Sequence, residues 1–249
     1  MNRGITLTFG DCAENHVGMQ KLGELAKNGF SLEDLKTITS YFPDKQIYKC
    51  RLHNIEFNNQ ITPDNIEKAY LYVIKNAVDN HQELFNEMVN LDWDKKALMK
   101  GRVVNKKARY NLCFDNFNQE PDYLNGKGRV IDINDCPELK SLYSKINSIP
   151  KCNDIKVEGN YYYDLSSTYI GMHGDSERRK VIGLRLGDSS FPIHYRWYKG
   201  FEPVSEIFSY ELEPGDIYVM SEKAVGTDWK KSSIYTLRHS AGKLELIDK

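Results

Sequence analysis

The chain has 249 residues, of which 40% are hydrophobic and 28% charged, a composition typical of a globular protein. Its formal net charge of −1 excludes binding to nucleic acid or membranes through overall charge, although it permits a local basic patch. The five cysteines form no C-x-x-C pair, and the sequence has neither a signal peptide nor a membrane-spanning apolar run, so we expect a soluble intracellular protein of the cytoplasm or nucleus.

The first hundred residues alternate between strand and helix patterns. Strand patterns lie at 5–9 and 69–78, and helical patterns at 16–29, 31–38 and 79–91. Ser31 with Asp34 three residues later indicates a variant capping box at the start of the second helix. We therefore expect residues 1–100 to form a small α/β N-terminal domain, which could be a recognition or partner module. The acids and histidine of "FGDCAENH" match no ligand set, and we interpret them as structural or partner-binding.

After residue 100, short β-rich segments dominate, and turn residues separate them. These segments are 109–114, 128–133, 159–165, 179–187, 191–198, 207–212, 215–220, 232–240 and 243–248. One helical insert interrupts them at 137–149. Many short strands with one helix favour a β-sandwich or jelly roll for residues 101–249.

One short stretch contains two metal-ligand residues, His173 and Asp175, in front of a buried strand pattern. On one strand, residues two apart point to the same face. A third ligand must come from elsewhere, and the later histidines are His194 and His239. Two histidines and one carboxylate leave three positions of an octahedral iron open, as Fe(II) oxygenases require.

The same stretch contains Arg185, which lies inside the apolar run "VIGLRLG". A buried cation costs several kcal/mol unless an anion meets it. The anion could be the carboxylate of a ligand, or an Asp or Glu that forms a structural salt bridge across the sheet.

Four stretches follow in order from about Arg109 to the C-terminus: "GNYYYDLSSTYIGMHGDSER", "VIGLRLG", "LEPGDIYVM" and "TLRHS". Together they resemble the AlkB-type Fe(II)/2-oxoglutarate-dependent oxygenases. The resemblance implies an α+β protein in which a double-stranded β-helix (jelly-roll) oxygenase domain at 101–249 follows the small α/β domain at 1–100. The first hundred residues have no counterpart in the family.

The resemblance implies His173, Asp175 and His239 as the ligands of Fe(II). His194 is the weaker candidate for the third ligand, and we favour a half-buried histidine with a hydrogen-bond partner there.

The resemblance also implies 2-oxoglutarate as cosubstrate. Asn160 and Tyr162 match the family's Asn-x-Tyr pair, and Tyr161 or Tyr163 could take the tyrosine role because the spacing to His173 is slightly long.

The chain departs from the family in one respect, because no arginine follows His239. Lys243 or Lys249 could substitute, or the cation could come from another strand. We hypothesise that Arg185 binds the far carboxylate of 2-oxoglutarate. Arg238 should point to the opposite face.

Glu177 matches an acidic position that contacts the substrate base in family members that act on nucleobases, and we assign it a catalytic role. The basic residues 178–180 could contact phosphates or form a solvated charge run. Residues 105–114 combine cations and aromatic rings, as nucleic-acid surfaces often do, but they could also be a basic turn entering a core strand.

The resemblance therefore implies an enzyme that hydroxylates or oxidatively demethylates a nucleobase in single-stranded or flipped-base DNA or RNA. The alternatives are a protein or small-molecule hydroxylase of the same fold, or a non-catalytic jelly-roll binding module.

Overall fold

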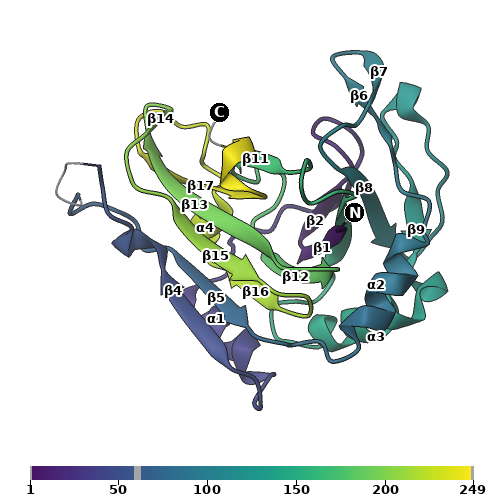
Figure 1. The fold of residues 1–249 in the computed structure, drawn as a ribbon, viewed down its shortest axis with the longest axis horizontal. Helices are drawn as coiled ribbons and strands as arrows, with labels where there is room; N and C mark the ends of the chain where they lie inside the picture. The colour runs from purple at the N-terminus through teal and green to yellow at the C-terminus, as the bar shows by residue number, and fades with distance from the viewer. Residues whose placement is uncertain (1, 59–62, 248–249) are drawn as a thin grey trace.

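An eight-stranded sheet that combines strands from both halves of the chain forms the centre of the protein (Figure 1). The structure is a computed structural model and describes residues 2–58 and 63–247. In spatial order the strands are β4 (Ile47–Arg51), β5 (Tyr70–Ile74), β16 (Ile217–Met220), β12 (Val181–Gly187), β1 (Gly4–Gly10), β10 (Lys156–Tyr162), β8 (Tyr110–Asp115) and β9 (Val130–Asp132). All neighbours pair antiparallel except β8 and β9, which are parallel.

The sheet runs across the domain boundary that we expect near residue 100. β1 lies between β12 and β10, and β5 pairs with β16, so strands from before residue 100 complete the sheet of the second half. A central strand such as β12 needs hydrogen-bond partners on both edges, and β1 supplies one of them. Residues 1–100 therefore contribute β1, β4 and β5 to the central sheet.

A second, smaller sheet packs against one face of the first. Its strands are β11 (Ile170–His173), β17 (Tyr235–Ala241), β13 (Phe191–Lys199), β14 (Glu202–Pro203) and β15 (Phe208–Leu212), with β15 pairing to β13. Val181 and Met220 of the large sheet share a buried apolar cluster with Trp197 and Leu237 of the small one. The fold is thus mostly β with few helices, and its two facing sheets are compatible with the β-sandwich or jelly roll that we expect for residues 101–249.

Helices cover the outer face of the large sheet. They are α1 (Leu32–Ser40), α2 (His81–Val89) and α3 (Pro137–Asn147), while α4 (Glu222–Val225) and α5 (Leu244–Ile247) are single turns elsewhere. The short 3-10 helices are η1 (Leu52–Asn54), η2 (Tyr123–Asn125) and η3 (Ile133–Asp135). Because strand side chains alternate, Leu7 and Leu184 face the helices, whereas Thr6 and Arg185 face the small sheet.

Two hairpins stand apart from the sheets: β2 (Cys12–Glu14) with β3 (Lys21–Gly23), and β6 (Lys96–Met99) with β7 (Arg102–Asn105). The first replaces the helix that we expect at 16–29, so that prediction is wrong. Gly18 and Gly23 have φ angles of 85° and 81°, which a continuous helix does not permit.

The other expected elements agree more closely with the structure. Ser31 and Asp34 form the expected capping box, with the Ser31 Oγ accepting from the Asp34 amide and the Asp34 carboxylate accepting from the Ser31 amide. The strand expected at 243–248 is wrong, because residues 244–247 form α5. No helix in the described part of the chain is long and apolar enough to cross a membrane.

The contact between helices and large sheet should dominate stability. Leu7 is fully buried in it, so Leu7→Ala should lower the free energy of unfolding by about 2–5 kcal/mol through lost burial and a residual cavity. Val17, which is 75% exposed, provides the control. Urea denaturation of Val17→Ala should give a value within about 0.5 kcal/mol of the parent protein. A Leu7→Ala loss as small as that of the control would contradict the layer assignment.

Candidate metal centre and its cavity

Strand pairing brings the two histidines of the candidate site together. β11 ends at His173, and its antiparallel partner β17 places His239 directly opposite. Asp175 lies beyond the end of β11, so the expectation that His173 and Asp175 share one strand is wrong. The turn after β11 returns the carboxylate to the histidines, and the Asp175 amide donates to the Val225 carbonyl at 3.0 Å to hold it there.

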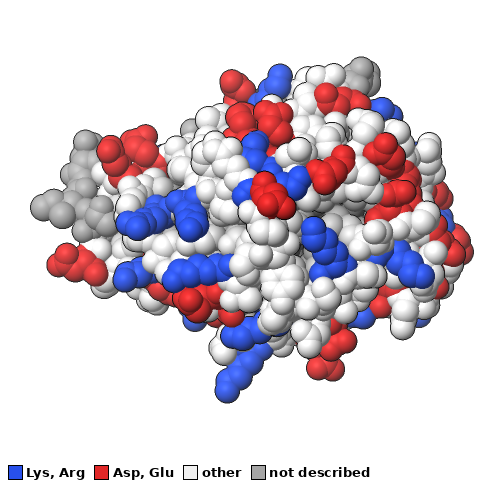
Figure 2. All heavy atoms as spheres, turned by 90° about the horizontal axis from the view of Figure 1, so that it is seen from below, with Lys and Arg blue, Asp and Glu red and all other residues white. Residues whose placement is uncertain are grey.

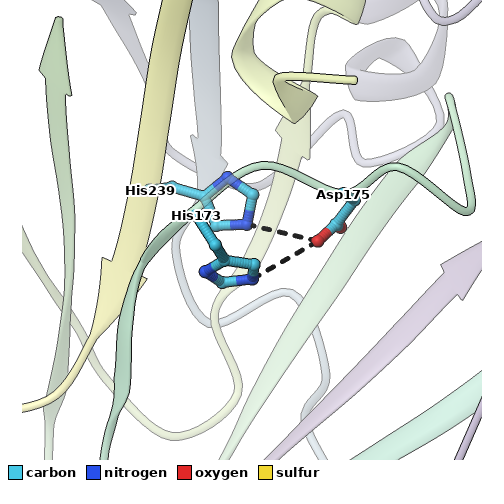
Figure 3. A group of neighbouring side chains, drawn as sticks. All are labelled: His173, Asp175 and His239. Atoms are coloured by element: carbon cyan, nitrogen blue, oxygen red, sulfur yellow. Dashed lines mark ion pairs between the residues drawn. The ribbon is translucent and has the colours of Figure 1, made fainter. Parts of the chain in front are cut away.

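The three side chains converge on one point (Figure 3). Their potential ligand atoms all lie within 4.8 Å of one another. The Asp175 Oδ1 is 3.4 Å from the His173 Nε2 and 3.7 Å from the His239 Nε2. Metal bonds of about 2.1 Å separate adjacent ligand atoms by about 3 Å, so a small inward movement would complete a site. Two imidazoles and a carboxylate are a donor set suited to Fe(II) and related divalent metals.

Hydrogen bonding and burial prepare these groups to bind a cation. The His173 Nδ1 lies 2.8 Å from the Gly171 carbonyl, which leaves its Nε2 lone pair directed at the site. Burial, reinforced by nearby His173, lowers the pKa of His239 to about 4, so its ring is neutral at physiological pH. Burial opposes ionisation of Asp175, but His173, His239 and Arg178 outweigh it and hold the pKa of this carboxyl well below its ordinary value.

The segment after β16 supports the turn that contains Asp175. A side chain at Gly174 would approach the Gly226 carbonyl to 2.0 Å and the Trp229 side chain to 2.8 Å, so only glycine fits there. The Trp229 indole donates to the Ser176 hydroxyl at 2.9 Å. The insert that separates the Gly-Asp strand from His239 therefore buttresses the candidate metal ligands.

A cavity of about 610 Å³ opens beside the three residues, between the two sheets. A polar row lines its large-sheet wall, because Arg185, Thr6, Asn160 and Asn111 lie in register across β12, β1, β10 and β8. Polar groups inside a sandwich are costly unless they are hydrogen-bonded or bind something. The row is hydrogen-bonded within itself, through Arg185 with Thr6 and Asn111 with Asn160, so it gives the cavity an ordered polar wall.

Arg185 is the largest charged group of this wall and is 1% exposed. Its Nη1 donates to the Thr6 hydroxyl at 2.5 Å, its guanidinium lies 4.7 Å from the centre of the Phe191 ring, and its Nε has no partner. Among residues 2–58 and 63–247, Arg185 forms no ion pair, so the structural salt bridge that we consider as an alternative is not present there. Burial accordingly lowers its pKa.

Of the three successive tyrosines, only Tyr162 lines the cavity. Tyr161 packs beside Trp93 with ring centres 5.2 Å apart, and the Tyr163 hydroxyl donates to the Lys107 carbonyl. Asn160 also lines the cavity, and its Oδ1 accepts from the Arg109 Nε at 2.6 Å. The structure thus brings Asn160, Tyr162 and Arg185 to one wall.

Glu177 and Arg178 also line the cavity, close to Asp175 in the sequence. Arg178 is buried and pairs with Glu158 and, at 3.1 Å, with Glu177, while its Nε lies 3.7 Å from the Asp175 Oδ2. Arg178 is therefore neither solvated nor free to meet a phosphate, and both sequence interpretations of it are wrong. Burial and the nearby Asp175 raise the pKa of Glu177.

The remaining candidates lie away from the three ligands. His194 has both ring nitrogens occupied, by the Ser209 hydroxyl at 2.7 Å and the Gly242 carbonyl at 2.6 Å, so the expected hydrogen-bond partner is present, although the side chain is buried and not half-buried. Arg238 packs 4.0 Å above the Tyr198 ring. Lys243 is exposed and does not line the cavity, and Lys249 is outside the described residues.

Several cavity residues were not identified from the sequence. Thr6, Glu14, His16 and Trp229 belong to segments with no recognisable motif. The one signal available was the pair of threonines in "ITLTF", which places polar side chains on one face of a buried strand.

Comparison with known protein families finds no family model that matches the chain. Among curated proteins, the "Uncharacterized protein R156" of Acanthamoeba polyphaga mimivirus is 51% identical over 244 residues, which are 96% of this chain and 95% of the relative.

Removal of any one ligand should abolish tight metal binding. We expect His173→Ala, Asp175→Ala and His239→Ala each to weaken Co(II) binding by roughly 100-fold or more, since each removes a whole ligand and even partners of ligands affect affinity 10- to 100-fold. Isothermal titration calorimetry measures this, with His81→Ala on α2 as the control. Wild-type affinity in all three variants would show that these residues are not a metal site.

The metal-free protein should lose stability in acid through His239. The unfolded chain binds a proton at His239 below about pH 6.5, whereas the folded protein binds it only near pH 4. The contribution of His239 to the free energy of unfolding, about 3 kcal/mol, is fully present above pH 6.5. It is lost progressively as the pH falls to about 4. In urea titrations, His239→Gln should show a shallower loss over this range than His81→Gln. Equal slopes would contradict the assignment.

Proposed function

The chain belongs to the same family as the mimivirus protein R156, and we propose that both are AlkB-like Fe(II)/2-oxoglutarate-dependent dioxygenases built on a double-stranded β-helix. The observation that carries the proposal is the convergence of His173, Asp175 and His239 at the wall of a polar cavity. The buried Arg185 on the same cavity supports it, because this cation calls for an anionic ligand.

The donor atoms fit a six-coordinate divalent metal. His173, Asp175 and His239 would hold one face of the ion, and the other three positions would be available to ligands in the cavity. Fe(II) bound there would supply the oxidising chemistry, in which 2-oxoglutarate and O2 are converted to succinate and CO2 and one oxygen atom is transferred to a substrate C–H bond. The protein supplies geometry, charge and exclusion of water.

Arg185 would bind the far carboxylate of 2-oxoglutarate. Its Nε is unused, and a guanidinium can grip a carboxylate with two parallel hydrogen bonds. Thr6 already fixes the Nη1, and the Phe191 ring covers the guanidinium, so the group is oriented before the ligand arrives. Asn160 and Tyr162 line the same wall and would flank the cosubstrate.

Glu177 is the residue best suited to contact the substrate. It lines the cavity two residues beyond Asp175, and Arg178 holds its carboxylate from the buried side. Arg178 also lies beside the Asp175 Oδ2, so it helps keep the Asp175 Oδ1 turned to the histidines.

The proposed reaction is hydroxylation or oxidative demethylation of a nucleobase in DNA or RNA. A C–H bond of the base would be oxidised, and an N-methyl group would leave as formaldehyde. The near-neutral net charge favours a second candidate, a protein or small-molecule hydroxylase of the same fold.

Succinate formation tests the activity directly. Protein incubated with Fe(II), 2-oxoglutarate and O2 should form succinate at a slow, substrate-independent rate, and Asp175→Ala should form none. Metal binding without any succinate, with or without oligonucleotide substrates, would contradict the oxygenase and favour a non-catalytic binding module.

Replacement of Arg185 should separate cosubstrate binding from metal binding. Arg185→Met should weaken 2-oxoglutarate binding by roughly two orders of magnitude, because charge-assisted hydrogen bonds are each worth about 1.5–3 kcal/mol. Co(II) binding should stay nearly unchanged, because Arg185 is not one of the three candidate ligands.

Lys243→Met is the matched control, since Lys243 is exposed and outside the cavity. Its 2-oxoglutarate dissociation constant, measured by calorimetry, should equal that of the parent protein. If the lysine variant loses cosubstrate and the arginine variant does not, Arg185 is a structural cation.

A further inference from the structure

The segment that contains the β6–β7 hairpin concentrates positive charge. Between residues 95 and 109 the chain has no Asp or Glu. Its seven basic residues are Lys95, Lys96, Lys100, Arg102, Lys106, Lys107 and Arg109. The whole chain has a formal net charge of −1, so this segment is a strong local departure from the average.

Most of these cations face solvent. Five of the seven are exposed, the exceptions being Lys106 and Arg109. Within residues 2–58 and 63–247, none of the seven forms an ion pair, although one of them, Lys95, lies over the Tyr110 ring. Like charges held together without counter-charges repel one another, and an anionic partner would relieve that repulsion.

The hairpin holds its charges in a fixed arrangement. Lys100 and Gly101 have φ angles of 48° and 75°, and Met99 pairs with Arg102, so a two-residue turn of the I′ kind joins the strands. Lys100 is therefore at the tip, and Lys96 and Arg102 lie behind it. Figure 1 shows the hairpin projecting from the molecule above β8.

The basic segment continues into the candidate active site. Lys106 turns inward and donates to the Asn15 carbonyl and to the Asn111 side chain at 2.9 and 2.8 Å. Arg109 lines the cavity itself, where its Nε is held by Asn160. A path of cations thus leads from the hairpin tip to the cavity.

The face seen from below, away from the hairpin, has a different pattern. Figure 2 shows Lys and Arg interspersed there with Asp and Glu. Ion pairs such as Lys36 with Glu33 and Lys45 with Asp79 belong to elements away from the hairpin. The basic segment differs from this face because residues 95–109 contain no Asp or Glu.

Aromatic rings lie beside the cationic path. Tyr110 and Tyr163 stack with ring centres 4.6 Å apart, immediately after the basic segment. Cations alternating with aromatic rings are typical of surfaces that bind single-stranded nucleic acid, where phosphates meet Lys and Arg and bases meet rings. An acidic protein segment would use the cations but would have no need of the rings.

We propose that the β6–β7 hairpin and the strand that follows it, residues 95–110, dock the backbone of a single-stranded nucleic acid and direct one base into the cavity. The proposal rests on the proposed function, since it assigns the partner of the same site. A single strand fits because a base stacked inside a duplex cannot enter a cavity that lies between two sheets.

Fluorescence anisotropy with a labelled 15-nucleotide oligo-dT tests the docking surface on the full-length, metal-free protein. The test variant is K96E/K100E/R102E, which reverses three exposed charges of the hairpin. The control is K49E/R51E/K140E, which makes the same charge change at exposed positions of β4 and α3. Thermal melts establish that both variants are folded.

The hairpin variant should bind the oligonucleotide at least 10-fold more weakly than the parent protein. The slope of log Kd against log salt should fall by about 2, since each single-strand phosphate contact contributes about 0.7. The control should stay within twofold in affinity and keep the parent slope. Equal losses in the two variants would overturn the proposal, and so would tighter binding of polyglutamate than of the oligonucleotide.

Failure of this inference is distinguishable from failure of the proposed function. Substrate-independent succinate formation needs only the cavity, so the hairpin variant should retain it. Succinate formation without oligonucleotide binding would overturn the docking surface and leave the oxygenase intact. Oligonucleotide binding through the hairpin by a protein that forms no succinate would support the docking surface and contradict the oxygenase.

Discussion

The pairing of β11 with β17 is the constraint on which the candidate site depends. It sets His173 opposite His239, and the turn that follows then needs only two residues to bring Asp175 to both rings. Two contacts from another segment hold that turn. The Val225 carbonyl accepts from the Asp175 amide, and Trp229 packs so closely against position 174 that only glycine fits there. The three donors are therefore positioned by backbone hydrogen bonds and close packing before any ligand binds.

The inner face of the large sheet complements this arrangement. A sandwich interior normally excludes charge, yet Arg185 lies there with one hydrogen bond, an aromatic neighbour and no ion pair among the described residues. An unpaired buried cation is costly, and in the proposed function the carboxylate of 2-oxoglutarate would offset that cost. The same strand contributes Leu184 to the core beneath the helices, so one strand supplies side chains both to the core and to the cavity wall.

Local patterns in the sequence located much of this architecture. The Ser31–Asp34 spacing fixed the start of α1, and the alternation of residues 181–187 put Arg185 and Leu184 on opposite faces. The His-x-Asp spacing identified two of the converging residues. The expected reason, that both lie on one strand, is wrong because β11 ends at His173. The third, His239, was indicated by a resemblance and not by any local pattern.

What the sequence did not indicate depends on contacts between distant segments. Nothing within "ITLTF" indicates that β1 pairs with β12 and β10, because pairing partners are not encoded in a strand's own alternation. The prediction of a solvated Arg178 is wrong because the run "ERRK" has the composition of a surface segment, whereas Arg178 forms an ion pair with Glu158 of β10 in the interior. Trp229 was missed because its contact is with the glycine of a turn more than fifty residues earlier in the chain.

An anaerobic titration of Fe(II) and 2-oxoglutarate tests the central claim, that the three donors and Arg185 form one iron and cosubstrate site. A keto acid chelated to Fe(II) gives a weak visible charge-transfer band. We predict such a band, saturating at one iron and one 2-oxoglutarate per chain. Iron that binds without producing the band on addition of 2-oxoglutarate, or a protein that binds no iron, would contradict the account.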